Sequence, residues 1–202
     1  MNSSTYQTPL DNHGGGFLPA LIWCAVLTVI CGVAYPVVST LIGGVLFPHE
    51  AKGSVIEVGG RAVGSSLVAQ PFADARYFVP RPSAANYDPT ALSGSNLATS
   101  NPALRERVAK DSAAIAAREG VDALKIPSDL VTTSGSGIDP HISPAAAELQ
   151  AARVAQARGL PVADVEAAIK THTRKPTFGV FGAARVNVLE LNLALDAVPS
   201  TK

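Results

Sequence analysis

Residues 132–143 form the densest collection of polar and conformationally special residues in this 202-residue chain, and we refer to them as the serine–glycine loop. Its glycines permit unusual backbone angles, and its hydroxyls can hydrogen-bond nearby amides. A loop of this composition before a helix N-terminus can bind an anion, or it can be a rigid elbow. The candidate residues for binding a nucleotide or a partner are Ser134, Gly135, Ser136, Gly137, Asp139, His141 and Gln150.

The same loop holds the residue types of a hydrolase triad in Ser136, Asp139 and His141. Neither Ser134 nor Ser136 has glycines two residues away on both sides, as a nucleophile elbow requires. We therefore favour a polar turn that precedes and caps the next helix. A membrane-anchored hydrolase or a binding module that uses this loop remains the alternative, and activity-based labelling of Ser134 or Ser136 would reveal the hydrolase.

Other motifs for chemistry are missing from the sequence. No Gly-Lys-Ser or Gly-Lys-Thr exists to form a phosphate-binding P-loop. Residues 135–140 begin like a dinucleotide fingerprint but place Pro140 where the last glycine must be. The four histidines lack metal-ligand spacing, and 16 basic residues balance 16 acidic ones without a run of like charge. We expect no catalytic residue, no metal and no nucleic-acid partner.

An uncharged apolar stretch near the N-terminus predicts a membrane anchor for the rest of the chain. No Asp, Glu, Lys or Arg occurs between Asp11 and Glu50. Since about 20 apolar residues in a helix cross a bilayer, we predict a transmembrane helix over residues 17–42. Residues 1–16 contain no basic residue, which disfavours a signal peptide, and we interpret them as a flexible polar tail.

Residues 43–202 are enough for one soluble domain. Two β-prone runs, 54–58 and 61–68, are joined by Gly59-Gly60 and predict a hairpin with a primed turn. Residues 70–87 contain three prolines and no helical period, so we predict an irregular packed loop that binds something or folds against a partner. Its partner-facing residues and those of its continuation are predicted to be Gln70, Arg81, Ser83 and Asn96.

Capping residues predict two long helices. Asn101-Pro102 begins the first and Gly120 closes it, while Ser143-Pro144 begins the second and Gly159 ends it. The second helix carries a narrow face of small side chains, which lets another backbone approach closely.

The last elements complete the fold class. A short third helix is predicted over residues 163–170. In residues 186–196, Asn187 and Glu190 resemble a capping box, so we predict a helix, although an alternating strand fits the same residues. The fold class is therefore α+β, a single N-terminal transmembrane helix followed by one small soluble α+β domain.

Several blocks of residues occur in a recognisable order. They include Gln70-Pro71-Phe72, Gly94-Ser95-Asn96-Leu97, residues 134–143 of the serine–glycine loop, and Val186-Asn187-Val188. In this order, and with the single apolar span before them, the chain resembles the C subunit of the Kdp potassium-transporting ATPase over nearly its whole length.

The resemblance implies a non-catalytic accessory subunit of an ATP-driven, high-affinity potassium uptake complex. The implied partners are a channel-like potassium-binding subunit and an ATP-hydrolysing P-type subunit. The implied role is to assemble and stabilise the complex, and to act as a catalytic chaperone that raises the ATP affinity of the hydrolysing subunit. ATP shared with that subunit is the cofactor that the resemblance implies. The chain itself lacks the Asp-Lys-Thr-Gly phosphorylation motif.

The charges and the resemblance predict opposite sides of the membrane for the soluble domain. Lys52 and Arg61 follow the span and no basic residue precedes it, which favours a cytoplasmic domain. The resemblance implies a domain outside the inner membrane, and we follow it because long domains translocate largely regardless of charge. An outward domain does not meet cytosolic ATP, so we rank assembly or outer-gate action above direct nucleotide contact.

Gln150 lies about two turns into the helix that the serine–glycine loop opens. Its amide can reach a ligand on the loop only if the loop folds back along that helix. We therefore predict that loop and helix present a surface to a partner subunit. On this interpretation Gly137→Val disrupts assembly, whereas Gln150→Ala leaves the complex intact.

Overall fold

The computed structural model describes residues 16–198 of the chain. The chain divides after Lys52 into two compact units, which are described one at a time. The flexible tail predicted for residues 1–16 lies, apart from Gly16, outside the described residues.

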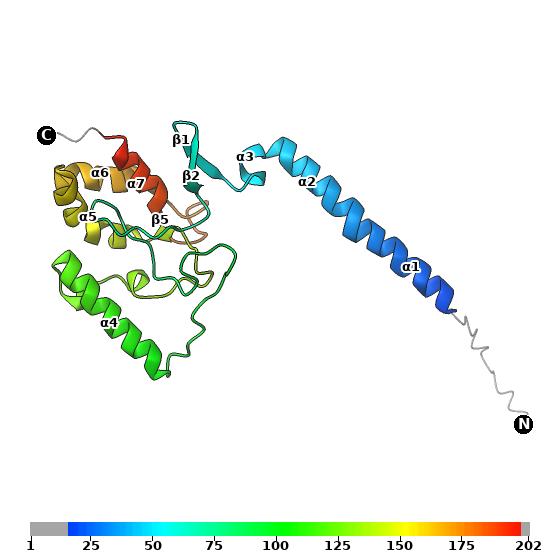
Figure 1. The fold of residues 1–202 in the computed structure, drawn as a ribbon, viewed down its shortest axis with the longest axis horizontal. Helices are drawn as coiled ribbons and strands as arrows, with labels where there is room; N and C mark the ends of the chain where they lie inside the picture. The colour runs from blue at the N-terminus through cyan, green and yellow to red at the C-terminus, as the bar shows by residue number, and fades with distance from the viewer. Residues whose placement is uncertain (1–15, 199–202) are drawn as a thin grey trace, which may run out of the picture. The chain divides into compact units, whose positions relative to one another are not determined.

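Within residues 16–52, the first unit contains one long apolar helical segment, Phe17–Leu46, drawn in blue in Figure 1. It consists of α1 (Phe17–Val29), a π-helical turn η1 (Ile30–Ala34) and α2 (Tyr35–Leu46). The π-turn comes just before Pro36, which has no N–H to give to the helix, so the wider turn accommodates the missing bond. The segment is long and apolar enough to cross a membrane, and its window of highest hydropathy is 0% buried within the chain.

The helix ends later than the sequence predicts. It runs past residue 42 and through Gly43-Gly44 to Leu46, because a glycine pair weakens a helix without stopping it. The stop comes at Phe47, whose φ of −135° is non-helical. Phe47 precedes Pro48, the first residue of the short helix α3 (Pro48–Ala51), and a residue before proline is disfavoured in the helical region.

The second unit begins with the predicted hairpin. Strands β1 (Val55–Val58) and β2 (Arg61–Ser65) pair antiparallel. Gly59 and Gly60 have φ of 59° and 76°, the positive values that a primed turn requires.

A second, three-stranded antiparallel sheet has the strand order β3-β5-β4. Its strands are β3 (His141–Ile142), β4 (Thr173–Arg174) and β5 (Arg185–Asn187). Residues distant in sequence therefore meet in one small sheet, with Ile142 opposite Val186 and Thr173 opposite the same Val186.

Four longer helices and two 3₁₀ turns make up the rest of the second unit as far as residue 198. They are α4 (Pro102–Glu119), η2 (Ala123–Lys125), η3 (Ser128–Leu130), α5 (Pro144–Arg158), α6 (Val162–His172) and α7 (Val188–Asp196). The predicted caps are confirmed, since the side chains of Asn101 and Ser143 accept hydrogen bonds at the starts of α4 and α5. Gly120 and Gly159 end these helices in the left-handed conformation.

Residues 186–196 contain both of the structures weighed from the sequence. Val186 and Asn187 belong to β5, and the rest form α7. The Asn187 side chain accepts from the N–H of Glu190 at 3.2 Å, as the capping pattern predicts. The carboxylate of Glu190 accepts from Arg174, so α7 is also joined to β4.

The hydrophobic core lies among α5, α6, α7 and the second sheet (Figure 1). Four buried alanines of α5 allow close packing, and they are Ala146, Ala147, Ala151 and Ala155. Residues 66–101, which we call the long loop, contain no helix or strand and yet place Phe78 in the core at 0% exposure. The irregular packed loop predicted for residues 70–87 is confirmed.

Candidate functional site

Ser134 lies at the centre of the serine–glycine loop and is only 2% exposed. Its hydroxyl oxygen accepts hydrogen bonds from the N–H of Gly137 at 3.1 Å and from the N–H of Asp139 at 3.2 Å. Its own N–H donates to the carbonyl of Pro82 at 2.9 Å. The Ser134 hydroxyl thus shapes the loop from inside and does not face solvent.

The serine–glycine loop is joined to the long loop by several hydrogen bonds. They run from Ser83 Oγ to the Gly137 carbonyl (2.6 Å), from the Ser93 N–H to the Ser136 carbonyl (3.1 Å) and from the Ala69 N–H to the Ile138 carbonyl (2.8 Å). Ser83 Oγ also accepts from the N–H groups of Ala85 and Tyr87, each at 3.0 Å. The two loops form one rigid assembly, since each supplies partners for the other's backbone.

The two central glycines have different roles. Gly137 has a φ of +79°, and a Cβ there would lie 2.6 Å from the Ala85 Cβ and 2.7 Å from the Ser93 oxygen. A Cβ at Gly135 would meet nothing within 4 Å. The close approach of the loops therefore requires glycine at position 137 and leaves space at position 135.

Asp139 is held between the side chains of Arg81 and His141. Arg81 Nη1 donates to Asp139 Oδ2 at 3.0 Å, and Asp139 Oδ1 lies 3.0 Å from the His141 N–H and 3.2 Å from His141 Nδ1. Burial raises the pKa of Asp139, but the hydrogen bonds from His141 and Arg81 outweigh it and hold the pKa below its ordinary value. The ionised carboxylate therefore ties the end of the loop to Arg81.

The N-terminus of α5 follows the loop and is where an anion would bind. The Asp129 carboxylate already accepts there, from the Ser143 N–H at 2.7 Å and from Ser143 Oγ at 3.2 Å. Ser143 Oγ in turn accepts from the N–H of Ala146. Asp129 and Asp139 both line an open depression of about 350 Å³ beside the loop. A carboxylate at the helix start supplies the negative charge that a bound phosphate would supply.

The residues of the imagined hydrolase triad do not form one. In residues 16–198, no hydrogen bond joins a serine hydroxyl to His141, whose Nδ1 faces Asp139. Ser136 is exposed, but its hydroxyl accepts from the Ile138 N–H at 3.2 Å. Ser134 is too buried to meet a substrate.

Gln150 is 0% exposed and lies in the core. Its Oε1 accepts from the Val79 N–H at 2.8 Å, and its Nε2 donates to the Val79 carbonyl at 3.2 Å and to the Ala146 carbonyl at 3.1 Å. The side chain therefore pairs with the long loop as a neighbouring strand would. The structure does not bring its amide to the surface of the serine–glycine loop.

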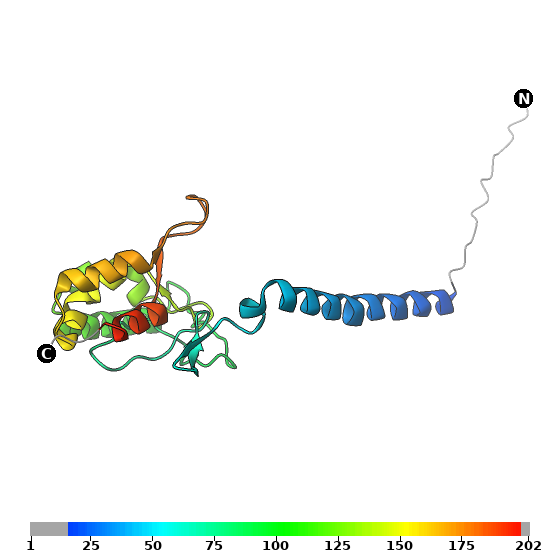
Figure 2. The ribbon, with the colours of Figure 1, turned by 90° about the horizontal axis from the view of Figure 1, so that it is seen from above.

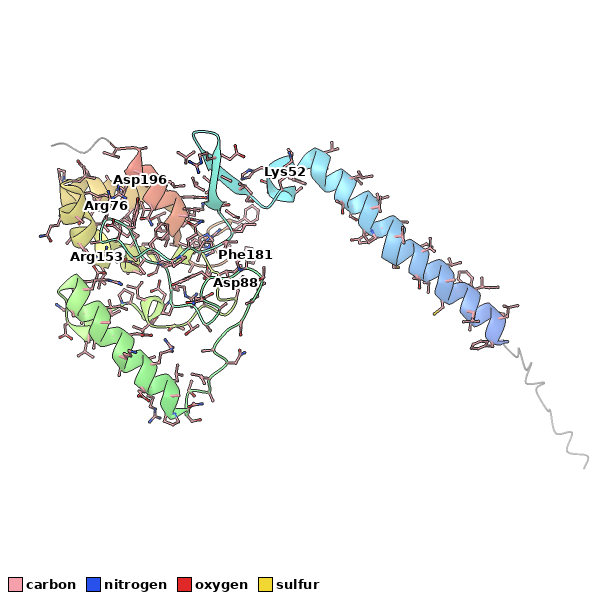
Figure 3. The ribbon with its side chains drawn as sticks, in the orientation of Figure 1. Lys52, Arg76, Asp88, Arg153, Phe181 and Asp196 are labelled. Carbon is pink, nitrogen blue, oxygen red and sulfur yellow. The ribbon has the colours of Figure 1, made fainter. Side chains whose placement is uncertain are left out.

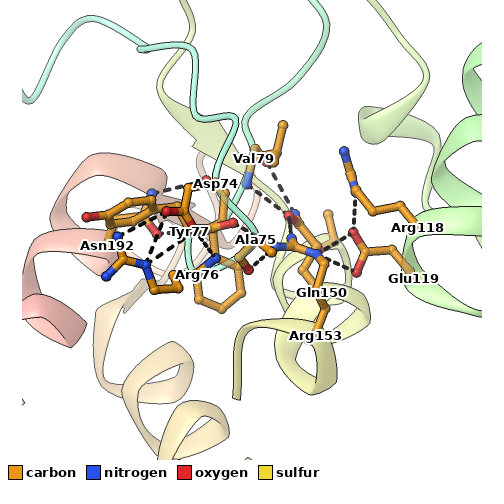
Figure 4. Close-up of polar contacts among 12 residues, drawn as sticks. Asp74, Ala75, Arg76, Tyr77, Val79, Arg118, Glu119, Gln150, Arg153 and Asn192 are labelled. Carbon is orange, nitrogen blue, oxygen red and sulfur yellow. Dashed lines mark hydrogen bonds and ion pairs between the residues drawn. The ribbon is translucent and has the colours of Figure 1, made fainter. Parts of the chain in front are cut away.

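Arg153, one turn further along α5, is a hub that sequence reasoning missed (Figure 4). Its guanidinium donates to both oxygens of Glu119 at 3.0 Å, to the carbonyls of Ala75 and Tyr77, and to Gln150 Oε1. The Glu119 side chain is 1% exposed. A glutamate in the last position of a helix opposes the helix dipole, and this unfavourable placement is the signal that points to a buried cationic partner.

The four residues predicted to face a partner are placed differently from one another. Gln70 Nε2 donates to the Val63 carbonyl at 2.9 Å, while Arg81 and Ser83 bond the serine–glycine loop. Only Asn96 among them is exposed, with a positive φ of 49°.

Asn96 lies in a region where the two loops meet at the surface. A Cβ on Gly94 would lie 2.9 Å from the Gly135 oxygen, so the backbones touch there. The exposed residues along this contact are Leu92, Ser93, Asn96, Gly135 and Ser136, and we call them the crest. The crest is therefore an exposed surface to which both loops contribute.

Fold and site together define a class of protein. It is a small α+β domain that follows an apolar helix of membrane-spanning length, and its two polar loops hydrogen-bond one another.

A family model described as K+-transporting ATPase, c chain (KdpC) matches residues 17–197, and the chain belongs to this family. It is 54% identical to the potassium-transporting ATPase KdpC subunit of Shewanella putrefaciens, over 98% of both chains. It is 54% identical to the same subunit of Xanthomonas oryzae, over 94% of this chain and 91% of the relative. For Methylococcus capsulatus the identity is 50%, over 93% and 98%. The family resemblance found in the sequence is confirmed.

Proposed function

We propose that this chain is a membrane-anchored accessory subunit of an ATP-driven potassium uptake complex. The observation that carries the proposal is the family match over residues 17–197, supported by relatives that are named as subunits of a potassium-transporting ATPase. The segment Phe17–Leu46 anchors the chain in the inner membrane, and the domain lies on the outer side.

The partners are a channel-like potassium-binding subunit and an ATP-hydrolysing P-type subunit, and the chain acts by assembling and stabilising them. The two-loop assembly supports this role because its polar groups are used to hold a fixed backbone shape. The crest is then a pre-organised surface, which binds a partner without a large cost in ordering.

The chain raises the ATP affinity of the hydrolysing subunit through its contacts with partner subunits, not by holding nucleotide on the serine–glycine loop. Two features support this ranking. The Asp129 carboxylate stands at the start of α5, where it would repel a phosphate. The hydroxyl of Ser134 and the amide of Gln150 are turned inward.

Co-purification tests the proposal. The tagged full-length chain, expressed with the remaining subunits and extracted in mild detergent, is expected to bring down an ATP-hydrolysing subunit and a membrane-embedded subunit. A chain that purifies alone from such cells, or that alkaline carbonate releases from membranes, contradicts the proposal.

The side of the domain is tested separately by cysteine labelling. Leu124 is 93% exposed, so Leu124→Cys in a chain with Cys24→Ser and Cys31→Ser offers one accessible thiol among the described residues. An impermeant thiol reagent is expected to label it in intact cells. Labelling that occurs only after permeabilisation would place the domain in the cytoplasm and revive direct contact with ATP.

A further inference from the structure

The segment between β4 and β5 carries an apolar tip that no residue in the described part of the domain covers. Phe178, Val180 and Phe181, which we call the apolar tip, are 90%, 76% and 68% exposed. Figure 2 shows this segment standing out from the helices, and Figure 3 shows Phe181 on the other side of the domain from Arg153. Large apolar side chains gathered on a projecting segment mark a site that meets another molecule or a membrane.

The tip has a defined backbone shape. Thr177 and Phe181 form two hydrogen bonds across it, each of 2.9 Å, and the Val180 N–H donates to the Thr177 carbonyl at 3.2 Å. Phe178 has a φ of +53°, a conformation that a bulky side chain rarely adopts. Strain of this kind persists where it serves a function, and here it turns the Phe178 ring to solvent.

The charged residues of the segment that carries the tip have one sign. Residues 170–185 contain Lys170, Arg174, Lys175 and Arg185 and no Asp or Glu. Arg174 is paired with Glu190 of α7, while Lys175 and Arg185 stand at the two ends of the projecting segment. Apolar groups at a tip with cations at its base match the layers of a membrane surface, where acyl chains lie beneath anionic phosphates.

We propose that the apolar tip inserts into the boundary between headgroups and acyl chains of the bilayer that holds the anchor, with Lys175 and Arg185 meeting lipid phosphates. The segment itself carries only basic residues, and the anchor places a bilayer within its reach, which favours a phosphate-rich surface. The acidic residues near its two ends belong to other elements: Glu148 and Glu166 line a depression with Lys175, and Asp129 and Asp139 line one with Arg185. The anchor keeps the domain close to the bilayer, so even weak insertion is effective. The inference goes beyond the proposed function and rests only on its membrane anchor.

The test uses the full-length chain with Cys24→Ser and Cys31→Ser, reconstituted into vesicles of phosphatidylcholine and phosphatidylglycerol. An environment-sensitive fluorophore is attached at Val180→Cys, and a matched control carries it at Leu124→Cys, also strongly exposed. Doxyl-labelled lipid is expected to quench the probe at position 180 severalfold more than the control, and aqueous iodide is expected to quench it less. The double variant Phe178→Ser, Phe181→Ser is expected to remove this difference.

Lys175→Gln is expected to weaken the lipid quenching when phosphatidylglycerol is present and to change little in phosphatidylcholine alone. Equal quenching at the two positions overturns the proposal, as does shielding of position 180 that arises only when partner subunits are added. Flotation with the vesicles reports the anchor independently. A chain that floats without lipid quenching at the tip contradicts this inference alone, whereas a chain that does not float contradicts the anchor and the inference together.

Discussion

The serine–glycine loop and the β4–β5 segment are both glycine-containing connections in the same domain, but they are built in opposite ways. The first turns its central hydroxyl inward, with Ser134 only 2% exposed. The second exposes apolar side chains, with Phe178 at 90%. In the first loop the serines and glycines stabilise the folded backbone. In the second loop the exposed phenylalanines and valine form a surface that water solvates poorly.

The comparison shows why a polar loop is an ambiguous signal in a sequence. Hydroxyls, glycines and an Asp next to a His suggest chemistry, but the same groups satisfy the backbone of a folded loop. An exposed apolar tip has no such internal use. The loop that draws less attention in the sequence is therefore the stronger candidate for contact with something outside the domain.

The largest effect is expected from Gly137→Val, which tests whether the two-loop assembly is a structural unit. A β-branched residue at φ +79° is strained, and its Cβ would overlap Ala85 and Ser93. We expect a loss of about 3 kcal/mol or more in unfolding free energy, together with loss of complex assembly. Thermal unfolding of the detergent-solubilised chain and co-purification measure the two effects.

Gly135→Ala is the matched control for that variant, because a Cβ there meets nothing within 4 Å. Its unfolding free energy is expected to lie within about 0.5 kcal/mol of that of the original chain. Similar losses for the two variants would show that the loops are not packed as described.

Gln150→Ala is expected to have the next largest effect. It removes the partners of the half-buried Val79 N–H and carbonyl, and it takes one acceptor from Arg153. We expect a cost of about 1–3 kcal/mol in unfolding free energy. The sequence-based prediction that this variant leaves the complex intact concerns assembly and is tested separately, by co-purification. Gln156→Ala, exposed on the same helix, is the control, and equal stability of the two variants would contradict the pairing.

A smaller effect is expected from pH through Asp139. Its folded-state pKa is lowered, so its contribution to stability is present above the ordinary carboxyl pKa of about 4 and is lost as pH falls through the folded-state value. Between neutral and acidic pH, the unfolding free energy should therefore fall by on the order of 1 kcal/mol less for Asp139→Asn than for the original chain. Parallel curves would show that the hydrogen bonds from His141 and Arg81 to Asp139 add no stability.

The smallest effect is expected at the apolar tip. Since Phe181 is 68% exposed, Phe181→Ser should change the unfolding free energy by less than about 0.5 kcal/mol. Chemical denaturation of the purified chain measures it. A clear loss of stability would mean that the tip packs against the domain, and the contrast between the two loops would disappear.

Local signals explain most of the fold that the sequence predicts. Caps such as Asn101 and Ser143, and terminal glycines such as Gly120, act through neighbours a few residues away, so they are readable in the chain itself. The end of the apolar helix is less readable, because the decisive proline comes after an apparent glycine stop.

The candidate site is less predictable because its contacts join distant residues. Arg153 meets Glu119 from another helix, Gln150 meets Val79 of the long loop, and neither pairing leaves a periodic pattern. The direction of the Ser134 hydroxyl likewise depends on the fold of the loop around it. Residue type shows what Ser134 is able to bond, and only the structure shows what it bonds.

Photoaffinity labelling with an azido-ATP in the assembled complex tests the central claim most directly. The labelled subunits are separated, and the modified peptides are mapped by mass spectrometry. If this chain acts through partner contacts, label is expected on the ATP-hydrolysing subunit and not on residues 132–143 of this chain. Saturable labelling within those residues, competed by unmodified ATP, would contradict the account.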